Sequence, residues 1–195
     1  MHHLSDLKTS ERYGRGTFQD TNVTEEIIEM GKKAIMDCKR YYGKSPIVNV
    51  SNVDGDEKPE SISMTFVPDH LNRIVYELIR NSLRATVENN ADLPAVDVLI
   101  SKGVENICIK ISDRGGGASL KDQAKWGAYL YSSPPKKSKS KEANVMPLAG
   151  YGYGIPLSKV YARYLGGDVN IRSIENYGER IQKYFRYFIF RPYKK

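Results

Sequence analysis

Residues 107–117 constrain the fold of this chain more than any other segment. Ile107, Ile109 and Ile111 alternate with other residues, a pattern typical of a strand with one face in a core. Asp113 continues the alternation, so its carboxylate is expected on the interior side, where it is costly unless donors meet it. Three glycines follow and allow a flat group to lie against the backbone. The amine of an adenine base would be such a donor; the alternative is a turn with a solvated aspartate.

The second informative segment is a helix predicted over residues 68–90, which begins at a proline. Its polar residues recur at steps of four and three and form one stripe: Arg73, Glu77, Asn81, Arg84 and Glu88. The opposite side of the same helix is expected to face the core and carries Leu71, Val75, Leu78, Ser82 and Ala85. Any amphipathic helix has a polar face. An asparagine between a carboxylate and a guanidinium is nevertheless useful, because these groups can ligate Mg²⁺, accept a proton and meet phosphate.

A second glycine-rich segment, residues 150–154, leads into a helix predicted over 155–165. The start of that helix offers unpaired N–H donors and a positive dipole end to phosphate. The pattern fits neither a P-loop nor a Rossmann fingerprint, since no Gly-Lys-Ser/Thr follows and no strand leads in. The stretch 132–149 is too long for a simple connection, and we interpret it as a lid beside the site or as a disordered insertion.

The remaining patterns complete an α+β domain. Further helices are predicted at 24–43 and just after Gly117, and strands at 47–52, 62–67, 95–101, 106–112, 168–174 and 184–190. Residues 1–22 are interpreted as a leader or linker remnant, and 23–192 as one domain. The expected fold class is a two-layer α/β sandwich in which helices cover one face of a mixed β-sheet.

Composition excludes several classes of protein. The chain has 195 residues, of which 40% are hydrophobic and 27% charged, as in globular domains, and no apolar run reaches the length of a membrane span. The net charge of +7 would suit an anionic partner. Much of that charge lies in residues 136–141 and 180–195, where solvated loop and tail charge is the simpler interpretation, so nucleic-acid binding is a minor hypothesis. Cys38 and Cys108 show no metal-ligand spacing and are expected to be buried, reduced thiols. In the segment that begins Met1-His2-His3-Leu4, no secretory signal or transit peptide is expected.

These motifs resemble the GHKL ATP-binding superfamily, in the form found in mitochondrial pyruvate dehydrogenase kinases. Residues 77–88 (ELIRNSLRATVE) look like its N box, 112–117 (SDRGGG) like its first glycine box, and 147–158 (PLAGYGYGIPLS) with 161–164 (YARY) like its second. Asn81 and Asp113 are marks of the superfamily. The strings RATVE and LAGYGYG are narrower and favour this kinase group over histidine kinases, gyrases and heat-shock chaperones. Branched-chain ketoacid dehydrogenase kinases are the nearest competitor.

The resemblance implies a Bergerat-fold domain and a protein serine kinase that uses ATP and Mg²⁺. Glu77 would be the catalytic base toward a substrate serine, Asn81 would hold Mg²⁺, and Arg84 would approach the phosphates. Asp113 would accept a hydrogen bond from adenine, and the rest of the nucleotide site would comprise Gly115, Gly117, Leu148, Gly150, Gly152, Tyr153 and Gly154. The implied acceptor is the E1α subunit of a 2-oxoacid dehydrogenase complex in the mitochondrial matrix, and the full-length family member is able to form a homodimer.

Some features depart from the family pattern. Arg73 stands where the family usually has a histidine, and it would favour the ionised form of Glu77 and weaken it as a base. Glu179 follows Gly178 where the family has a threonine. The family's amino-terminal helical bundle and carboxy-terminal tail are not represented. These departures support a second interpretation, an ATP-binding module with weak or no catalysis. A histidine-kinase ATPase domain is a third, but no histidine lies in a convincing phospho-accepting helix.

Overall fold

The structure is a computed structural model that describes residues 18–52, 61–104, 106–132, 152–174 and, for the backbone alone, 184–190. Its elements are, in chain order, β1 (Gln19–Asn22), α2 (Val23–Tyr42), β2 (Val48–Asn52), β3 (Ser63–Phe66), α3 (Pro68–Asn89), β4 (Val96–Lys102), β5 (Ile107–Asp113), α4 (Leu120–Gln123), α5 (Gly154–Tyr164), β6 (Asp168–Arg172) and β7 (Tyr184–Phe190). The departures predicted at Gly178 and Glu179, and the basic stretches at 136–141 and 191–195, lie outside the described residues.

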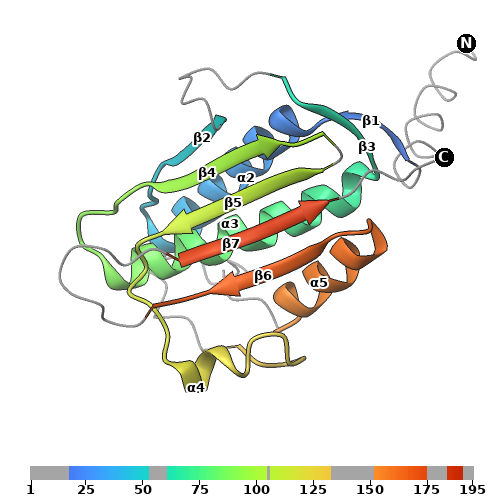
Figure 1. The fold of residues 1–195 in the computed structure, drawn as a ribbon. Coiled ribbons are helices and arrows are strands. Elements are labelled where there is room, and N and C mark those ends of the chain that lie inside the picture. Colours follow the sequence, from blue (N-terminus) through green and yellow to red (C-terminus); the bar gives the residue numbers. More distant parts are fainter. Residues whose placement is uncertain (1–17, 53–60, 105, 133–151, 175–183, 191–195) are drawn as a thin grey trace, which may run out of the picture.

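The main sheet has five strands in the order β2-β4-β5-β7-β6 (Figure 1). β2 pairs with β4 in parallel, whereas the other three pairs are antiparallel. The sheet is therefore mixed, as predicted. β5 lies in the centre, so the turn that follows Asp113 leaves from the middle strand of the sheet.

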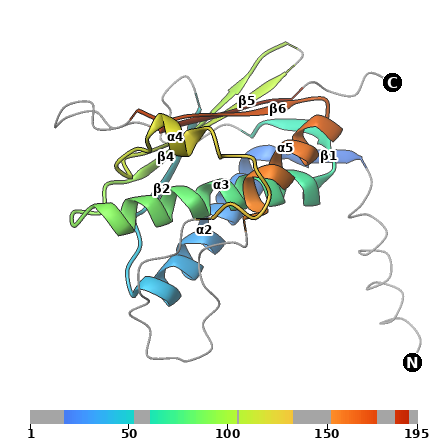
Figure 2. The same ribbon diagram turned by 90° about the horizontal axis from the view of Figure 1, so that it is seen from below.

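The helices α2, α3 and α5 lie together on one face of this sheet (Figure 2). The core is between the two layers, where Ile107, Ile109 and Ile111 of β5 and Leu71 and Leu78 of α3 are fully buried. Alternation in β5 and helical spacing in α3 thus direct apolar side chains into one interface. The predicted two-layer α+β fold is confirmed. Within the described ranges, no helix combines the length and the apolar character needed to cross a membrane.

The ends of α2 follow from local chemistry. The Asn22 side chain accepts a hydrogen bond from the Glu25 N–H and caps the first turn. At the other end Gly43 adopts a left-handed conformation with φ of 73°, and its N–H bonds back to the Lys39 carbonyl. The helix therefore covers nearly the predicted span.

Two details differ from the sequence predictions. Residues 19–22, assigned to a leader, form β1, which pairs with β3 in a separate two-stranded sheet. The segment is polar and shows little alternation, so its strand conformation depends on hydrogen bonds from a partner more than forty residues away. Cys38 is buried but Cys108 is only half-buried. Burial raises the pKa of both thiols.

Candidate nucleotide-binding cleft

A cleft of about 230 Å³ lies between α3, the turn after β5, the segment after α4 and the start of α5. Gly115 and Gly117 from the first glycine-rich segment line it, together with Gly152 and Gly154 from the second. The two segments are far apart in the chain, and they meet as the sequence analysis predicted. Leu148 and Gly150, and the predicted lid beyond residue 132, lie outside the described residues.

Asp113 ends β5 and anchors the turn that follows. The residue is 2% exposed and continues the buried face of the strand, as its parity predicted. Its Oδ1 accepts a hydrogen bond of 3.0 Å from the N–H of Gly115. The carboxylate is therefore buried and is not among the described residues that line the cleft, and its orientation is tied to the backbone of Gly115, which does line it.

The glycine turn is fastened to the end of α3. The Nδ2 atom of Asn89 donates to the carbonyl of Gly115 at 2.8 Å, and the Nδ2 atom of Asn90 donates to the carbonyl of Arg114 at 2.6 Å. A Cβ atom on Gly115 would stand 2.8 Å from the carbonyl carbon of Ala85. The expectation that Ala85 faces the core was wrong, because it is half-buried and lines the cleft beneath this turn.

The polar stripe of α3 forms one wall of the cleft. Glu77, Asn81, Arg84 and Glu88 all line it, whereas the side chain of Arg73, 52% exposed, lies outside the lining. Asn81 therefore presents its amide to the cleft one turn after Glu77. Arg80 is a further lining residue that the sequence analysis did not single out, although it follows Glu77 by three residues and precedes Arg84 by four.

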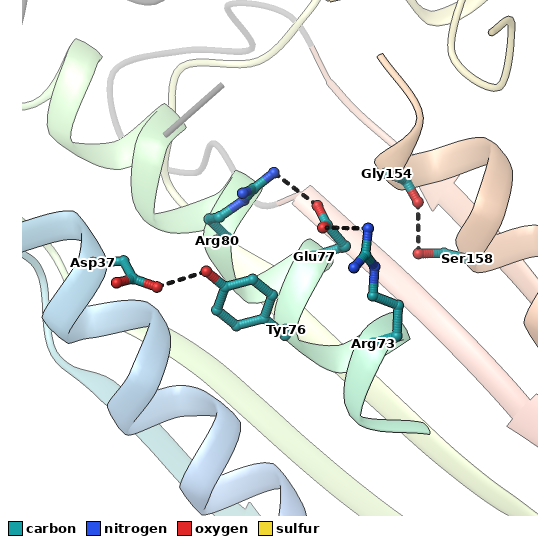
Figure 3. Close-up of polar contacts among 7 residues, drawn as sticks. All are labelled: Asp37, Arg73, Tyr76, Glu77, Arg80, Gly154 and Ser158. Atoms are coloured by element: carbon teal, nitrogen blue, oxygen red, sulfur yellow. Dashed lines mark hydrogen bonds and ion pairs between the residues drawn. The ribbon is translucent and has the colours of Figure 1, made fainter. Parts of the chain in front are cut away.

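Glu77 is held in a more enclosed setting than a helix surface would give. It is only 5% exposed, and its Oε2 accepts a hydrogen bond of 2.9 Å from Arg80 while its Oε1 lies 3.5 Å from Arg73 (Figure 3). A Cβ atom on Gly154 would stand 2.8 Å from Glu77 Oε2. The carboxylate thus lies against the first residue of α5, where the helix dipole favours negative charge.

Arg84 is also paired. Its Nε donates to Glu88 Oε1 at 3.1 Å, and the hydroxyl of Tyr42 in α2 donates to the same oxygen at 2.6 Å. Burial, followed by the hydrogen bond to Glu88, raises the pKa of Tyr42, so the phenol remains a donor. The guanidinium predicted to approach phosphate is therefore positioned through Glu88 by a tyrosine on the neighbouring helix.

The segment after α4 supplies lining residues that sequence reasoning missed, among them Trp126 and Tyr131. The hydroxyl of Tyr131 donates to Asp122 Oδ1 at 3.2 Å. Hydrogen bonds from Ser119 and from Tyr131 hold the pKa of Asp122 below its usual value. The sequence offered one signal that this segment lines the site: it directly precedes the stretch interpreted as a lid.

The start of α5 closes the cleft on the remaining side. Gly152 has a φ of 81°, and a Cβ atom there would stand 2.5 Å from the carbonyl carbon of Leu130, so its backbone packs directly on the segment after α4. Tyr153 is 41% exposed, and its ring lies 6.0 Å from that of Tyr129, away from the described cleft lining. Ser158 donates to the Gly154 carbonyl at 2.8 Å and fastens the first turn (Figure 3).

Few protein ligands for a metal are present in the described part of the chain. No three or more His, Cys, Asp or Glu side chains there are grouped so that they could hold an ion. Asn81 offers an amide oxygen at the cleft. Such a donor set fits Mg²⁺, which keeps several water molecules and takes phosphate oxygens from a nucleotide, better than an ion caged by protein alone.

Helices on one face of a mixed sheet, with a cleft between a long helix and two glycine-rich turns, define a GHKL-type ATP-binding domain. Residues 66–188 match the family described as Histidine kinase-, DNA gyrase B-, and HSP90-like ATPase. This match covers more than half of the chain, which therefore belongs to that family.

Three named relatives point to one branch of this family, the mitochondrial pyruvate dehydrogenase kinases. The chain is 44% identical over 149 residues to the mitochondrial pyruvate dehydrogenase (acetyl-transferring) kinase of Drosophila melanogaster, covering 72% of this chain and 35% of that protein. It is 37% identical over 179 residues to isozyme 4 of the mitochondrial kinase of Mus musculus, covering 90% and 43%. Isozyme 4 of Homo sapiens is 40% identical over 144 residues, covering 72% and 35%. The predicted resemblance is confirmed, and the chain spans less than half the length of these relatives.

Proposed function

We propose that this chain is the catalytic domain of a Mg²⁺-ATP-dependent protein serine kinase of the pyruvate dehydrogenase kinase type. The observation that carries the proposal is the single cleft that Glu77, Asn81 and both glycine-rich turns line together. Phosphoryl transfer depends mainly on positioning and charge stabilisation, and this cleft has groups suited to both. The similarity to named pyruvate dehydrogenase kinases supports the same conclusion.

At the base end of the nucleotide, the proposal assigns Asp113 to adenine. One of its oxygens is oriented by the Gly115 N–H, and a carboxylate so held is a strong acceptor for an exocyclic amine. Gly115 and Gly117 would lie along the nucleotide on one side, with Gly152 and Gly154 on the other. Leu148 and Gly150 remain part of the proposed site by their motif, whereas the Tyr153 side chain lies outside the described lining of the cleft.

At the phosphate end, Asn81 would hold the metal and Arg84 would contact phosphate oxygens. Mg²⁺ would neutralise charge on the phosphates as the terminal group is transferred. Glu77 would accept the proton of the substrate serine hydroxyl, and Arg80 keeps the carboxylate in one orientation at the cleft wall. The start of α5 adds backbone N–H groups at the same end.

The wider assignment follows from the relatives. The acceptor would be the E1α subunit of a 2-oxoacid dehydrogenase complex, and the location the mitochondrial matrix. A homodimer is proposed for the full-length protein only. The branched-chain ketoacid complex is the alternative source of the acceptor, and phosphorylation of the two E1 preparations in parallel would distinguish them.

A second candidate is an ATP-binding module with weak or no catalysis. The contacts that favour it are those of two arginines with Glu77, because both carboxylate oxygens already have a guanidinium partner and a substrate hydroxyl would have to compete for them. Under this alternative the chain binds ATP tightly and transfers little phosphate.

Nucleotide binding has an intrinsic reporter. Trp126 is the chain's only tryptophan and lines the cleft, so its fluorescence should change when ATP binds. Asp113→Asn keeps an acceptor for the Gly115 N–H but removes the charge. We expect ATP affinity to fall at least about 10-fold, since a hydrogen bond to a charged group contributes about 1.5–3 kcal/mol. Chelation of Mg²⁺ should weaken binding in both proteins. Unchanged affinity in the variant would exclude Asp113 as the adenine acceptor.

The kinase assignment is tested by transfer of labelled phosphate to E1. We expect Glu77→Gln to lower the transfer rate by about 10²- to 10⁴-fold, the usual contribution of a general base, while ATP affinity changes little. ATP binding without any transfer by the wild-type chain would favour the second candidate. Transfer that Glu77→Gln leaves unchanged would remove Glu77 from the mechanism.

A further inference from the structure

The two arginines that contact Glu77 are not equivalent. The side chains of Arg80 and Glu77 are 14% and 6% exposed, and their atoms are 2.9 Å apart. The contact from Arg73 is longer, 3.5 Å, and the Arg73 side chain is 52% exposed. A short, shielded, charge-assisted hydrogen bond holds its geometry, whereas an exposed pair is screened and exchanges with water. Arg80 is therefore the partner that determines where the Glu77 carboxylate lies.

Arg80 is itself held in place by Tyr76, which is hydrogen-bonded to α2. Its guanidinium lies over the ring of Tyr76, 5.6 Å from the centroid. The hydroxyl of Tyr76 donates to Asp37 Oδ2 of α2 at 2.6 Å, which fixes the outer end of the Tyr76 side chain against α2 (Figure 3). Burial and the hydrogen bond to Asp37 raise the pKa of Tyr76 to about 12, which keeps the phenol protonated as the donor.

These contacts form one continuous chain from Asp37 through Tyr76 and Arg80 to Glu77. It begins on a helix whose described residues do not line the cleft and ends at a carboxylate against the first residue of α5. A salt bridge that only stabilised the fold would not need to end at that point. We propose that Arg80 is the positioning residue of Glu77, and that α2 sets this position through Tyr76 and Asp37. The inference rests on the proposed function for its catalytic meaning.

The experiment compares Arg80→Gln with Arg73→Gln, which removes the same charge from the same carboxylate at the exposed side. Rates of phosphate transfer to E1 and ATP affinities from tryptophan fluorescence are measured for each. We expect Arg80→Gln to lower kcat about 100-fold, as for a reacting group displaced by about 1 Å, with KM for ATP nearly unchanged. Arg73→Gln should lower kcat by less than about 3-fold, as for an exposed pair.

Two further variants separate positioning from folding. Arg80→Lys retains a cation within reach of one carboxylate oxygen, and it should restore most of kcat. Tyr76→Phe keeps the ring but releases it from Asp37, and it should lower kcat by about 3- to 10-fold, the equivalent of one hydrogen bond. Equal loss of kcat in the two glutamine variants, or loss of kcat and ATP affinity together without rescue by lysine, would overturn the proposal.

A second readout does not depend on kinase activity. The side-chain carboxyl carbon of Glu77 gives a ¹³C resonance that Glu77→Gln identifies by its disappearance. We expect Arg80→Gln to shift or broaden this resonance and Arg73→Gln to leave it nearly in place. If the wild-type chain transfers no phosphate, the proposed function fails while this resonance still decides the positioning role. A resonance that Arg80→Gln leaves unchanged would overturn that role.

Discussion

Gly115→Ala tests how the first glycine turn packs on α3. The added methyl carbon would stand 2.8 Å from the carbonyl carbon of Ala85 and closer still to its Cβ. Carbon atoms in contact normally lie about 3.5–4.0 Å apart, so the turn must move away from the helix by roughly 1 Å. Both contacting atoms belong to Ala85 within α3, and the carbonyl carbon is part of the helix backbone, which cannot rotate away as a side chain can.

The size of the effect follows from what this movement disturbs. Overpacking of a tight contact costs about 1–3 kcal/mol. The same shift weakens the hydrogen bonds of Gly115 with Asp113 and Asn89, which measure 3.0 and 2.8 Å. We expect the free energy of unfolding to fall by about 2–3 kcal/mol. ATP affinity should fall at least about 10-fold, equivalent to about 1.4 kcal/mol.

Urea unfolding and a fluorescence titration with ATP measure the two quantities, and Gly31→Ala is the matched control. Gly31 is buried in α2, and a Cβ there would meet Val48 at an ordinary 3.5 Å. That substitution should stabilise the helix by about 0.5–1 kcal/mol and leave ATP affinity unchanged. Ala85→Gly in the Gly115→Ala background removes one of the two clashing atoms and should restore part of the affinity. Native affinity and stability in Gly115→Ala would refute the packing argument.

Three further variants test the cleft and the hydrogen bonds between α2 and α3. Gly152→Ala combines a φ of 81° with a contact of 2.5 Å to the Leu130 backbone, so it should lower ATP affinity in the fluorescence titration, and native affinity would contradict the close approach. Tyr42→Phe loses the 2.6 Å hydrogen bond to Glu88, and it should lower the free energy of unfolding in urea by about 0.5–1.5 kcal/mol; an unchanged midpoint would contradict this. The pKa of Tyr76 is raised from 10.0 to about 12, so the folded state favours the protonated phenol, and its contribution to stability is complete below pH 10 and lost as pH rises toward 12. The wild-type chain should therefore lose stability more steeply than Tyr76→Phe between pH 10 and 12, and equal slopes would argue against a buried, hydrogen-bonded phenol.

Much of the fold could be predicted because its signals are local. The spacing of apolar residues in α3 and the alternation in β5 each determine which side chains face the core. The burial of Asp113 followed from the same parity as Ile109 and Ile111. The direction of the polar stripe toward a cleft followed from its motif together with the two glycine segments.

The enclosure of Glu77 could not be predicted in this way. Helical spacing assigns it to a polar surface stripe, yet it is 5% exposed because the first residue of α5 lies against it. That contact depends on how α5 packs beside α3, which spacing within α3 does not encode. The same holds for Arg80, whose role depends on Tyr76 and Asp37 of a neighbouring helix, and for Ala85, whose exposure depends on the glycine turn above it.

Two of the hydrogen bonds between α2 and α3 lead to arginines of the cleft. Tyr42 of α2 reaches Glu88, which holds Arg84. Tyr76 of α3 reaches a carboxylate of α2 and supports Arg80 through its ring. Long cationic side chains lose considerable conformational entropy when they are ordered, so a nucleotide that had to order Arg84, or a substrate that had to order Glu77 and Arg80, would bind more weakly. These contacts within the protein already order both arginines. A small shift of α2 would therefore move Arg84 and Arg80 at the phosphate end of the cleft, although no described residue of α2 lines it.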